Sequence, residues 1–491
     1  MTTALTPHQG PRTGSASLVW VAAAASLLPV FALFLAGQGT VLRLAIPAGA
    51  VVVGFALYQR RPIGYVHFVL WTWFLTPLVR RLVDWRAGFE DHNLVLLAPF
   101  LVSAISGLTL LRERQLAREL RLSPFLLCIA GVLYGFAVGL LRWRLHATEG
   151  VTPGEIVYGL FGWLAPLLFG LHLYIRWPMY EEHKRAVQKS FFWAVLLLGA
   201  YGVYQFLAPP AWDRFWLEHV IADIGAESFG RPEPFQVRVW STLNSPGVFA
   251  NVLMVGLLLL FSARSRIKML ATTAGYTAFL LSLVRTSWLG WLVGLVVLAR
   301  NTKGGQISRL LISMALLPVL ISPLMLNQEI ATAVTDRLQT FHSTRQDESY
   351  QDRAEEYRVL LASLAADPFG EGLSNAETWQ GYTMDSGIIL IFYYCGWLGA
   401  ALFLAGIALC VRSMPSGRNS EDLIVPAYRA VVVAMIFELL SGNIFAGPSG
   451  AMLWTCIGLG LSLQQAEKVS LSPQRIGSLA PADLAIPDLV A

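Results

Sequence analysis

The sequence predicts an all-α fold: a polytopic transmembrane bundle of about 14 helices with a large, partly helical extracytoplasmic loop. Three observations predict it. Hydrophobic residues make up 55% of the 491-residue chain and charged residues only 14%, whereas soluble domains carry about 25% charged residues. Mean hydropathy is +0.56. Apolar runs of membrane length follow one another from Leu18 to Leu463, with short polar connectors between them. We therefore expect one continuous helical domain.

Each apolar run is expected to form one helix, because about 20 apolar residues span the hydrocarbon core. The expected spans are 17–36, 41–58, 63–79, 94–111, 124–141, 156–175, 191–208, 246–262, 268–284, 287–299, 308–326, 386–410, 424–441 and 446–463. Residues 1–16 and 465–491 are expected to be cytoplasmic tails, the second of them disordered. Residues 17–464 then form the transmembrane domain.

Basic residues in the connectors predict the orientation, since short cytoplasmic loops collect Lys and Arg. Six alternate connectors are basic: 59–62, 112–121, 181–189, 263–268, 299–305 and 411–418. Both termini are therefore predicted to be cytoplasmic. The long connectors 209–244 and 327–385 fall on the opposite, extracytoplasmic side. Connectors 80–92 and 142–155 are assigned to that side as well, although they are basic.

Neither a metal nor a cofactor is expected. The four cysteines, Cys128, Cys395, Cys410 and Cys456, lie within apolar runs and suggest no disulfide framework. No Asp-x-Asp pair or His/carboxylate cluster has the spacing of metal ligands. The pI of 9.0 is attributed to cytoplasmic anchoring, so no nucleic-acid partner is expected.

Arg285 is the most informative residue, because a charge inside an apolar run costs about 2.5–3.5 kcal/mol on insertion scales. It lies where the short helices 268–284 and 287–299 join, which are either two crossings or broken helices that line a cavity. Arg285 is thus a candidate functional residue. The alternative is an interfacial arginine that contacts lipid phosphate, with Trp288 and Trp291 as belt aromatics.

A second candidate segment, 234–253, carries Arg238 and Trp240 ahead of a helix start. Asn244 or Ser245 can cap this helix, with Pro246 in its first turn. The positive end of the helix dipole beside Arg238 predicts an anion site. The alternative for Arg238 is snorkelling to lipid headgroups.

The third segment is the long outer connector with the helix that follows it. Residues 348–365 have helical spacing, and a Pro-Gly turn at 368–372 ends that pattern. The chain then returns to the membrane at Asp385 and Ser386. Asp385 is a candidate functional carboxylate or merely the helix N-cap.

Together these residues resemble the O-antigen polymerase and ligase superfamily over roughly the C-terminal half, from about 238 to 396. The matching elements are Arg238 with Asn244 and Pro246; Arg285 with Thr286 and Ser287; Arg353 with Tyr357; Pro368 with Gly370 and Gly372; and Gly396 with Gly399. The ligases usually show a His at the loop-to-helix return, where this chain has Met384, Asp385, Ser386 and Gly387. The resemblance therefore favours a polymerase of O-antigen or exopolysaccharide type, with a ligase or protein O-oligosaccharyltransferase as the alternative.

The resemblance implies an undecaprenyl-pyrophosphate-linked oligosaccharide as donor, used on the periplasmic side of the bacterial inner membrane. Membrane lipids and other assembly proteins, such as a flippase and a chain-length regulator, are the implied partners. Arg238 and Arg285 would stabilise the pyrophosphate leaving group without a metal. Asp385 is the candidate base, with Glu371 second.

Substrate binding is assigned to the outer segments. Arg353 and Glu371 are polar candidates, and Trp240, Tyr357 and Tyr382 can stack on sugar faces. Interfacial belts recruit the same aromatic residues. A flippase or transporter for a lipid-linked saccharide is the alternative from another class, because such proteins also have about 14 helices and buried arginines.

Overall fold

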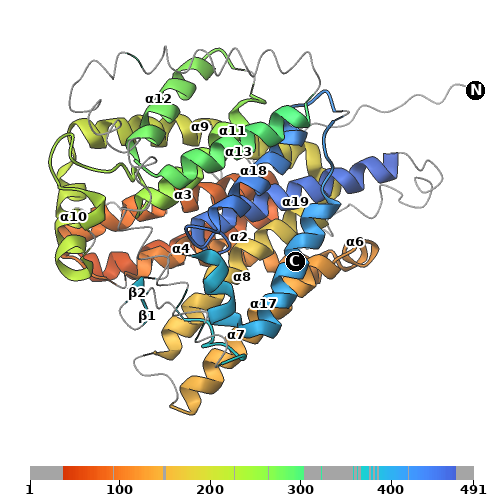
Figure 1. The fold of residues 1–491 in the computed structure, drawn as a ribbon, viewed down its shortest axis with the longest axis horizontal. Helices are drawn as coiled ribbons and strands as arrows, with labels where there is room; N and C mark the ends of the chain where they lie inside the picture. The colour runs from red at the N-terminus through yellow and green to blue at the C-terminus, as the bar shows by residue number, and fades with distance from the viewer. Residues whose placement is uncertain are drawn as a thin grey trace, which may run out of the picture.

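The structure is a computed structural model. It describes residues 37–302 except 92, 147–150, 226 and 264; residues 367–374; and residues 386–470 except 419. Positions 322, 358, 362, 378–379 and 382–383 are described as well. Most of these residues are helical, which confirms the predicted all-α class (Figure 1). The strands among the described residues are β1 (Thr378–Trp379) and β2 (Tyr382–Thr383), which form a short antiparallel ladder.

Seven described segments are long and apolar enough to cross a membrane. They are α2 (Gly39–Arg60), α3 (Pro62–Ala87), the run Leu94–Arg112 that contains α4 (Leu97–Ala104) and α5 (Leu108–Arg112), α7 (Ser123–Arg144), α8 (Pro153–Ile175), the run Trp177–Leu207 that contains α9 (Tyr180–Leu207), and α17 (Gly387–Ser413). These segments match seven of the expected spans.

Five further helices match expected spans: α11 (Pro246–Leu260), α12 (Lys268–Leu281), α13 (Arg285–Arg300), α18 (Ile424–Glu438) and α19 (Gly447–Ser470). The expected spans 17–36 and 308–326 lie outside the described residues. Two helices lie in connectors, α6 (Arg114–Glu119) and α10 (Ala211–Ile224).

Helix starts follow local sequence signals. Proline stands in the first turn of α3, α7, α8 and α11, where its missing N–H removes no intrahelical bond. At the start of α8, Thr152 and Glu155 form a reciprocal capping box. Such signals fix where each apolar run begins to be helical.

Four of the connectors predicted to be cytoplasmic gather at one end of the bundle. Arg176 pairs with Glu113 at 2.9 Å, and Lys184 pairs with Asp422 at 3.1 Å. Gln188 donates to the hydroxyl of Ser262 at 3.1 Å. Four connectors that are far apart in the sequence therefore lie together, as their predicted alternation requires.

The remaining connectors gather at the opposite end, where α10 lies far from α6 (Figure 1). Arg81, from connector 80–92, pairs with Asp213 at 3.2 Å. Arg142, from connector 142–155, pairs with Asp367 and, at 2.8 Å, with Glu371. These arginines have carboxylate partners in the long connectors, which explains why two connectors at this end are basic.

Candidate functional site

The site begins at the N-terminus of α11. Ser245 is the N-cap, and its hydroxyl accepts a 3.1 Å hydrogen bond from the backbone N–H of Val248. Pro246 occupies the first turn. The predicted helix entry is therefore confirmed, with Ser245 rather than Asn244 as the cap. The positive end of the α11 dipole opens toward the loop that carries Arg238.

Arg238 contacts the break between α12 and α13. Its Nε donates to the carbonyl of Ser282 at 3.3 Å and its Nη2 to the carbonyl of Leu283 at 3.4 Å. The neighbouring Val239 N–H donates to Leu281 at 3.1 Å. α13 then begins at Arg285, which is half-buried. The structure thus brings the Arg238 segment to the turn that starts with Arg285, although the two arginines are 47 positions apart in the sequence.

The break itself has an unusual backbone. Leu283 has a φ of 55°, in the left-handed region that a bulky residue rarely adopts. Such positions persist when the surroundings fix them, and here the Arg238 side chain binds the Leu283 carbonyl. The expected spans 268–284 and 287–299 therefore correspond to two separate short helices, α12 and α13, and Arg238 braces the turn at 282–284 between them.

Glu438 is a functional candidate that sequence reasoning missed. It ends α18 and is 3% exposed. Its carboxyl accepts a 3.3 Å bond from the Ser441 hydroxyl, and the hydroxyls of Thr286 and Ser287 lie beside it. Oε1 has no hydrogen-bond partner in the described part of the chain. A lone carboxylate in the apolar run 424–441 was the signal that could have identified it.

Helix α13 can approach this carboxylate because residue 290 is glycine. A Cβ at Gly290 would lie 2.6 Å from Glu438 Oε1. In the first turn of α13, the Ser287 hydroxyl also donates to Asn251 of α11 at 2.9 Å. The first turns of α13 are therefore held between α11 and α18.

The return from the long outer connector reaches the same place. Ser386 caps α17 and accepts a 3.5 Å bond from Ile389 N–H, so the capping role considered for Asp385 belongs to Ser386. The next residue, Gly387, donates its N–H to the Leu439 carbonyl at 2.9 Å. All three segments chosen from the sequence thus meet at one end of the bundle.

The Pro-Gly turn interlocks with a break in α17. Gly396 has a φ of 55° inside this helix, which frees the carbonyls before it. Glu371 N–H donates to Tyr393 at 2.7 Å and Gly372 N–H to Tyr394 at 3.1 Å. The predicted elements 368–372 and 396–399 are therefore in direct contact. The Glu371 side chain is bound to Arg142.

Trp240 does not fit its predicted role as a sugar platform. It is fully buried and packs on Trp216, with ring centroids 5.5 Å apart, and on Phe229. Its rings offer no exposed face to a sugar, so Trp240 supports the loop instead. Tyr382 lies in β2. Arg353, Tyr357 and Asp385 lie outside the described residues.

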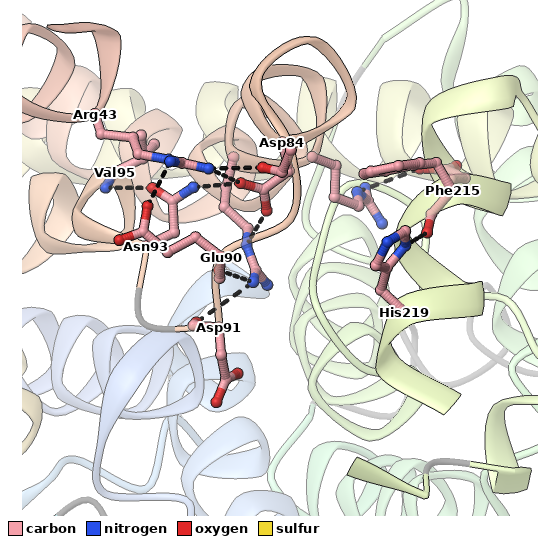
Figure 2. A network of polar contacts seen from close by, with 12 residues as sticks. Arg43, Asp84, Glu90, Asp91, Asn93, Val95, Phe215 and His219 are labelled. Atoms are coloured by element: carbon pink, nitrogen blue, oxygen red, sulfur yellow. Dashed lines mark hydrogen bonds and ion pairs between the residues drawn. The ribbon is translucent and has the colours of Figure 1, made fainter. Parts of the chain in front are cut away.

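A network of hydrogen bonds and ion pairs holds the C-terminal end of α3 (Figure 2). Buried Asp84 accepts bonds from Arg43 at 3.2 Å and Asn93 at 2.6 Å, and it pairs with Arg80 at 2.7 Å. Arg43 also pairs with Glu90 at 2.6 Å. These contacts join the start of α2 to the end of α3 and provide a rigid base beside α10.

The arrangement suits the binding of a phosphate-like anion. The guanidinium groups of Arg238 and Arg285 and two helix N-termini belong to adjoining segments, and such groups bind phosphate oxygens. Among the described residues, no group of three or more His, Cys, Asp or Glu side chains has the geometry of a metal site. Glu438 places a buried carboxylate beside the first turn of α13.

Comparison with known proteins adds no family to this geometry. The chain matches no protein-family model, and no curated protein is significantly similar to it.

Proposed function

We propose that this chain is a membrane glycosyltransferase of the O-antigen polymerase and ligase superfamily. In this proposal it joins undecaprenyl-pyrophosphate-linked repeat units of a bacterial surface polysaccharide on the periplasmic face of the inner membrane. The observation that carries the proposal is the contact of Arg238 with the α12–α13 break, at Ser282 and Leu283. This contact joins the segment that carries Arg238 to the turn that leads into Arg285, beside the N-termini of α11 and α13.

The donor pyrophosphate would bind at the N-termini of α11 and α13, with its lipid in the bilayer and its glycan outside. The acceptor hydroxyl attacks the anomeric carbon, and the C–O bond to the pyrophosphate breaks. Negative charge then develops on the leaving pyrophosphate. Arg238 and Arg285 are suited to stabilise it, because a guanidinium stays charged and binds phosphate oxygens bidentately.

Each arginine contact of this kind is worth about 2.7–4 kcal/mol in the transition state, by comparison with oxyanion-hole donors. The acceptor hydroxyl loses its proton as it attacks, and a carboxylate is suited to accept this proton. Asp385 is the base proposed from the sequence, and Glu438 is a second candidate because its carboxyl lies beside Thr286 and Ser287 in the first turn of α13. The product is a longer lipid-linked chain and free undecaprenyl pyrophosphate.

The test is elongation by purified protein in lipid nanodiscs, supplied with lipid-linked repeat units and EDTA. We expect a ladder of chain lengths. Arg238→Ala and Arg285→Ala should each lower its rate by about 100-fold or more. Arg231→Ala is the matched control, because Arg231 is an exposed arginine in the same connector, and it should elongate normally.

Other outcomes identify other functions. Normal ladders from both arginine variants contradict the leaving-group role. A single transfer to a different acceptor indicates a ligase. Movement of the lipid-linked saccharide across a vesicle membrane, with no new glycosidic bond, indicates a flippase.

A further inference from the structure

The loop that carries Arg238 is held by a buried arginine on another helix. Arg81, in α3, is fully buried. Its Nη1 donates to the Leu243 carbonyl at 3.0 Å and its Nη2 to the Ser241 carbonyl at 2.5 Å. Its Nε faces the Asp213 carboxylate of α10 at 3.2 Å. One guanidinium therefore links α3, α10 and the turn at 240–243.

The other side of this turn is held by Gln205 of α9. Gln205 Oε1 accepts the N–H groups of Trp240 at 3.1 Å and Ser241 at 2.8 Å. Gln205 Nε2 donates to Asp213 Oδ2 at 2.6 Å. Arg81 and Gln205, which hold the turn from two sides, thus both contact the carboxylate of Asp213. We call these three residues, Arg81, Asp213 and Gln205, the clamp.

Ser241 shows that the clamp maintains a strained backbone. Its φ is 52°, in the left-handed region. Its N–H, carbonyl and hydroxyl are all engaged, the hydroxyl donating to Leu198 at 2.6 Å. A non-glycine residue keeps such a conformation only where its surroundings over-determine it.

The clamped turn lies between the two parts of the candidate anion site. Arg238 stands three positions before Ser241, and the N-cap Ser245 stands four positions after it. We infer that Arg81 is a positioning residue: through the turn at 240–243, it sets the placement of Arg238 relative to the N-terminus of α11. This inference rests on the proposed function.

The geometry requires arginine in particular. The planar guanidinium presents donors in fixed directions, and here two of its nitrogens donate to the two carbonyls of the turn while the third lies 3.2 Å from the Asp213 carboxylate. A lysine at this position keeps the charge but has one donor atom, which cannot reach both carbonyls and the carboxylate. Arg81→Lys therefore removes the clamp without removing the charge.

The experiment uses the full-length protein in nanodiscs, with hydrogen exchange and elongation kinetics on the same samples. We expect Arg81→Lys to speed exchange in 237–244 and to lower kcat about 100-fold, the size of effect that a displacement of about 1 Å can have. Arg80→Lys is the matched control. Arg80 is the adjacent buried arginine, which pairs with Asp84, and its variant should leave both values unchanged.

A second variant separates positioning from folding. Arg81→Met with Asp213→Leu replaces the buried pair by apolar side chains, a change that often leaves stability intact. We expect this double variant to remain folded at the temperature of the assay, as circular dichroism reports, while exchange in 237–244 rises and kcat falls.

Unchanged exchange in 237–244 for Arg81→Lys overturns the inference. Faster exchange with a wild-type kcat also overturns the inference. A lower kcat without a change in exchange overturns it as well. Absence of elongation by the wild-type protein contradicts the proposed function instead, and hydrogen exchange then still reports whether Arg81 holds the turn.

Discussion

The N–H of Gly387 donates to the carbonyl of Leu439 at 2.9 Å, so the start of α17 lies against the end of α18. Glu438 is the residue before Leu439, and Asp385 is two residues before Gly387. The buried carboxylate found in the structure therefore ends a helix that contacts the start of α17, and in the sequence α17 directly follows the carboxylate proposed as base.

Replacing each carboxylate by its amide decides which one accepts the proton. Glu438→Gln keeps the size and the hydrogen-bonding capacity toward Ser441, so the fold should persist. If Glu438 is the base, its variant should lose about 100-fold to 10,000-fold in kcat, while Asp385→Asn retains most activity. The reverse result assigns the role to Asp385. Full activity of both variants rules out both groups.

The sequence was sufficient for the features that depend on local patterns. Apolar runs located the helices, and the Ser245–Pro246 pair located the start of α11, because helix length and capping are local properties. The position of Arg81 could not be predicted in this way. Its bonds reach Ser241 and Leu243, 160 and 162 residues away, and only the packing of α3 on the 209–244 connector creates them. The predicted role of Trp240 as a sugar platform was wrong for the same reason, since the burial of Trp240 depends on Trp216 of α10.

The interlock of the Pro-Gly turn with α17 predicts a steric effect at Gly370. This residue has a φ of +84°, and a Cβ there would lie 2.3 Å from the backbone nitrogen of Gly396. We expect Gly370→Ala to destabilise the protein by about 2–4 kcal/mol, through strain and overlap. Gly49→Ala in α2 is the control, because no atom lies within 4 Å of the added Cβ. Equal unfolding temperatures for the two variants would contradict the interlock.

The grouping of connectors predicts which surfaces an impermeant reagent can reach. Glu218 in α10 and Arg118 in α6 are both exposed, and these two helices lie at opposite ends of the bundle (Figure 1). All four native cysteines are buried, so single added cysteines can be labelled selectively. In intact spheroplasts, a membrane-impermeant maleimide should label Glu218→Cys but not Arg118→Cys. Labelling of Arg118→Cys alone would invert the predicted orientation.

The pair of Asp213 with Arg81 predicts a pH dependence of stability. Burial raises the pKa of Asp213 above its ordinary value, and Arg81 offsets this effect only in part. The folded protein then holds this proton more tightly than the unfolded chain. Its contribution to stability is therefore greatest at low pH and is lost as the pH rises through the folded-state pKa. The unfolding temperature of the wild type minus that of Asp213→Asn should fall as the pH increases from about 4. A difference that grows with pH would show that pairing outweighs burial.

The ion pairs of Arg142 predict how the long outer connector is attached to the bundle. It pairs with Asp367, which directly precedes the Pro-Gly turn, and with Glu371, which lies within it. Arg142→Ala leaves two neighbouring carboxylates that repel one another, so segment 367–374 should loosen from α7 and α17. We expect faster hydrogen exchange at Glu371 and Gly372, whose N–H groups bind the α17 carbonyls, and slower elongation. Arg144→Ala, an exposed arginine two positions along α7, should change neither. Exchange at 371–372 that stays at the wild-type rate in Arg142→Ala would mean that the backbone bonds to Tyr393 and Tyr394 hold the segment without the ion pairs.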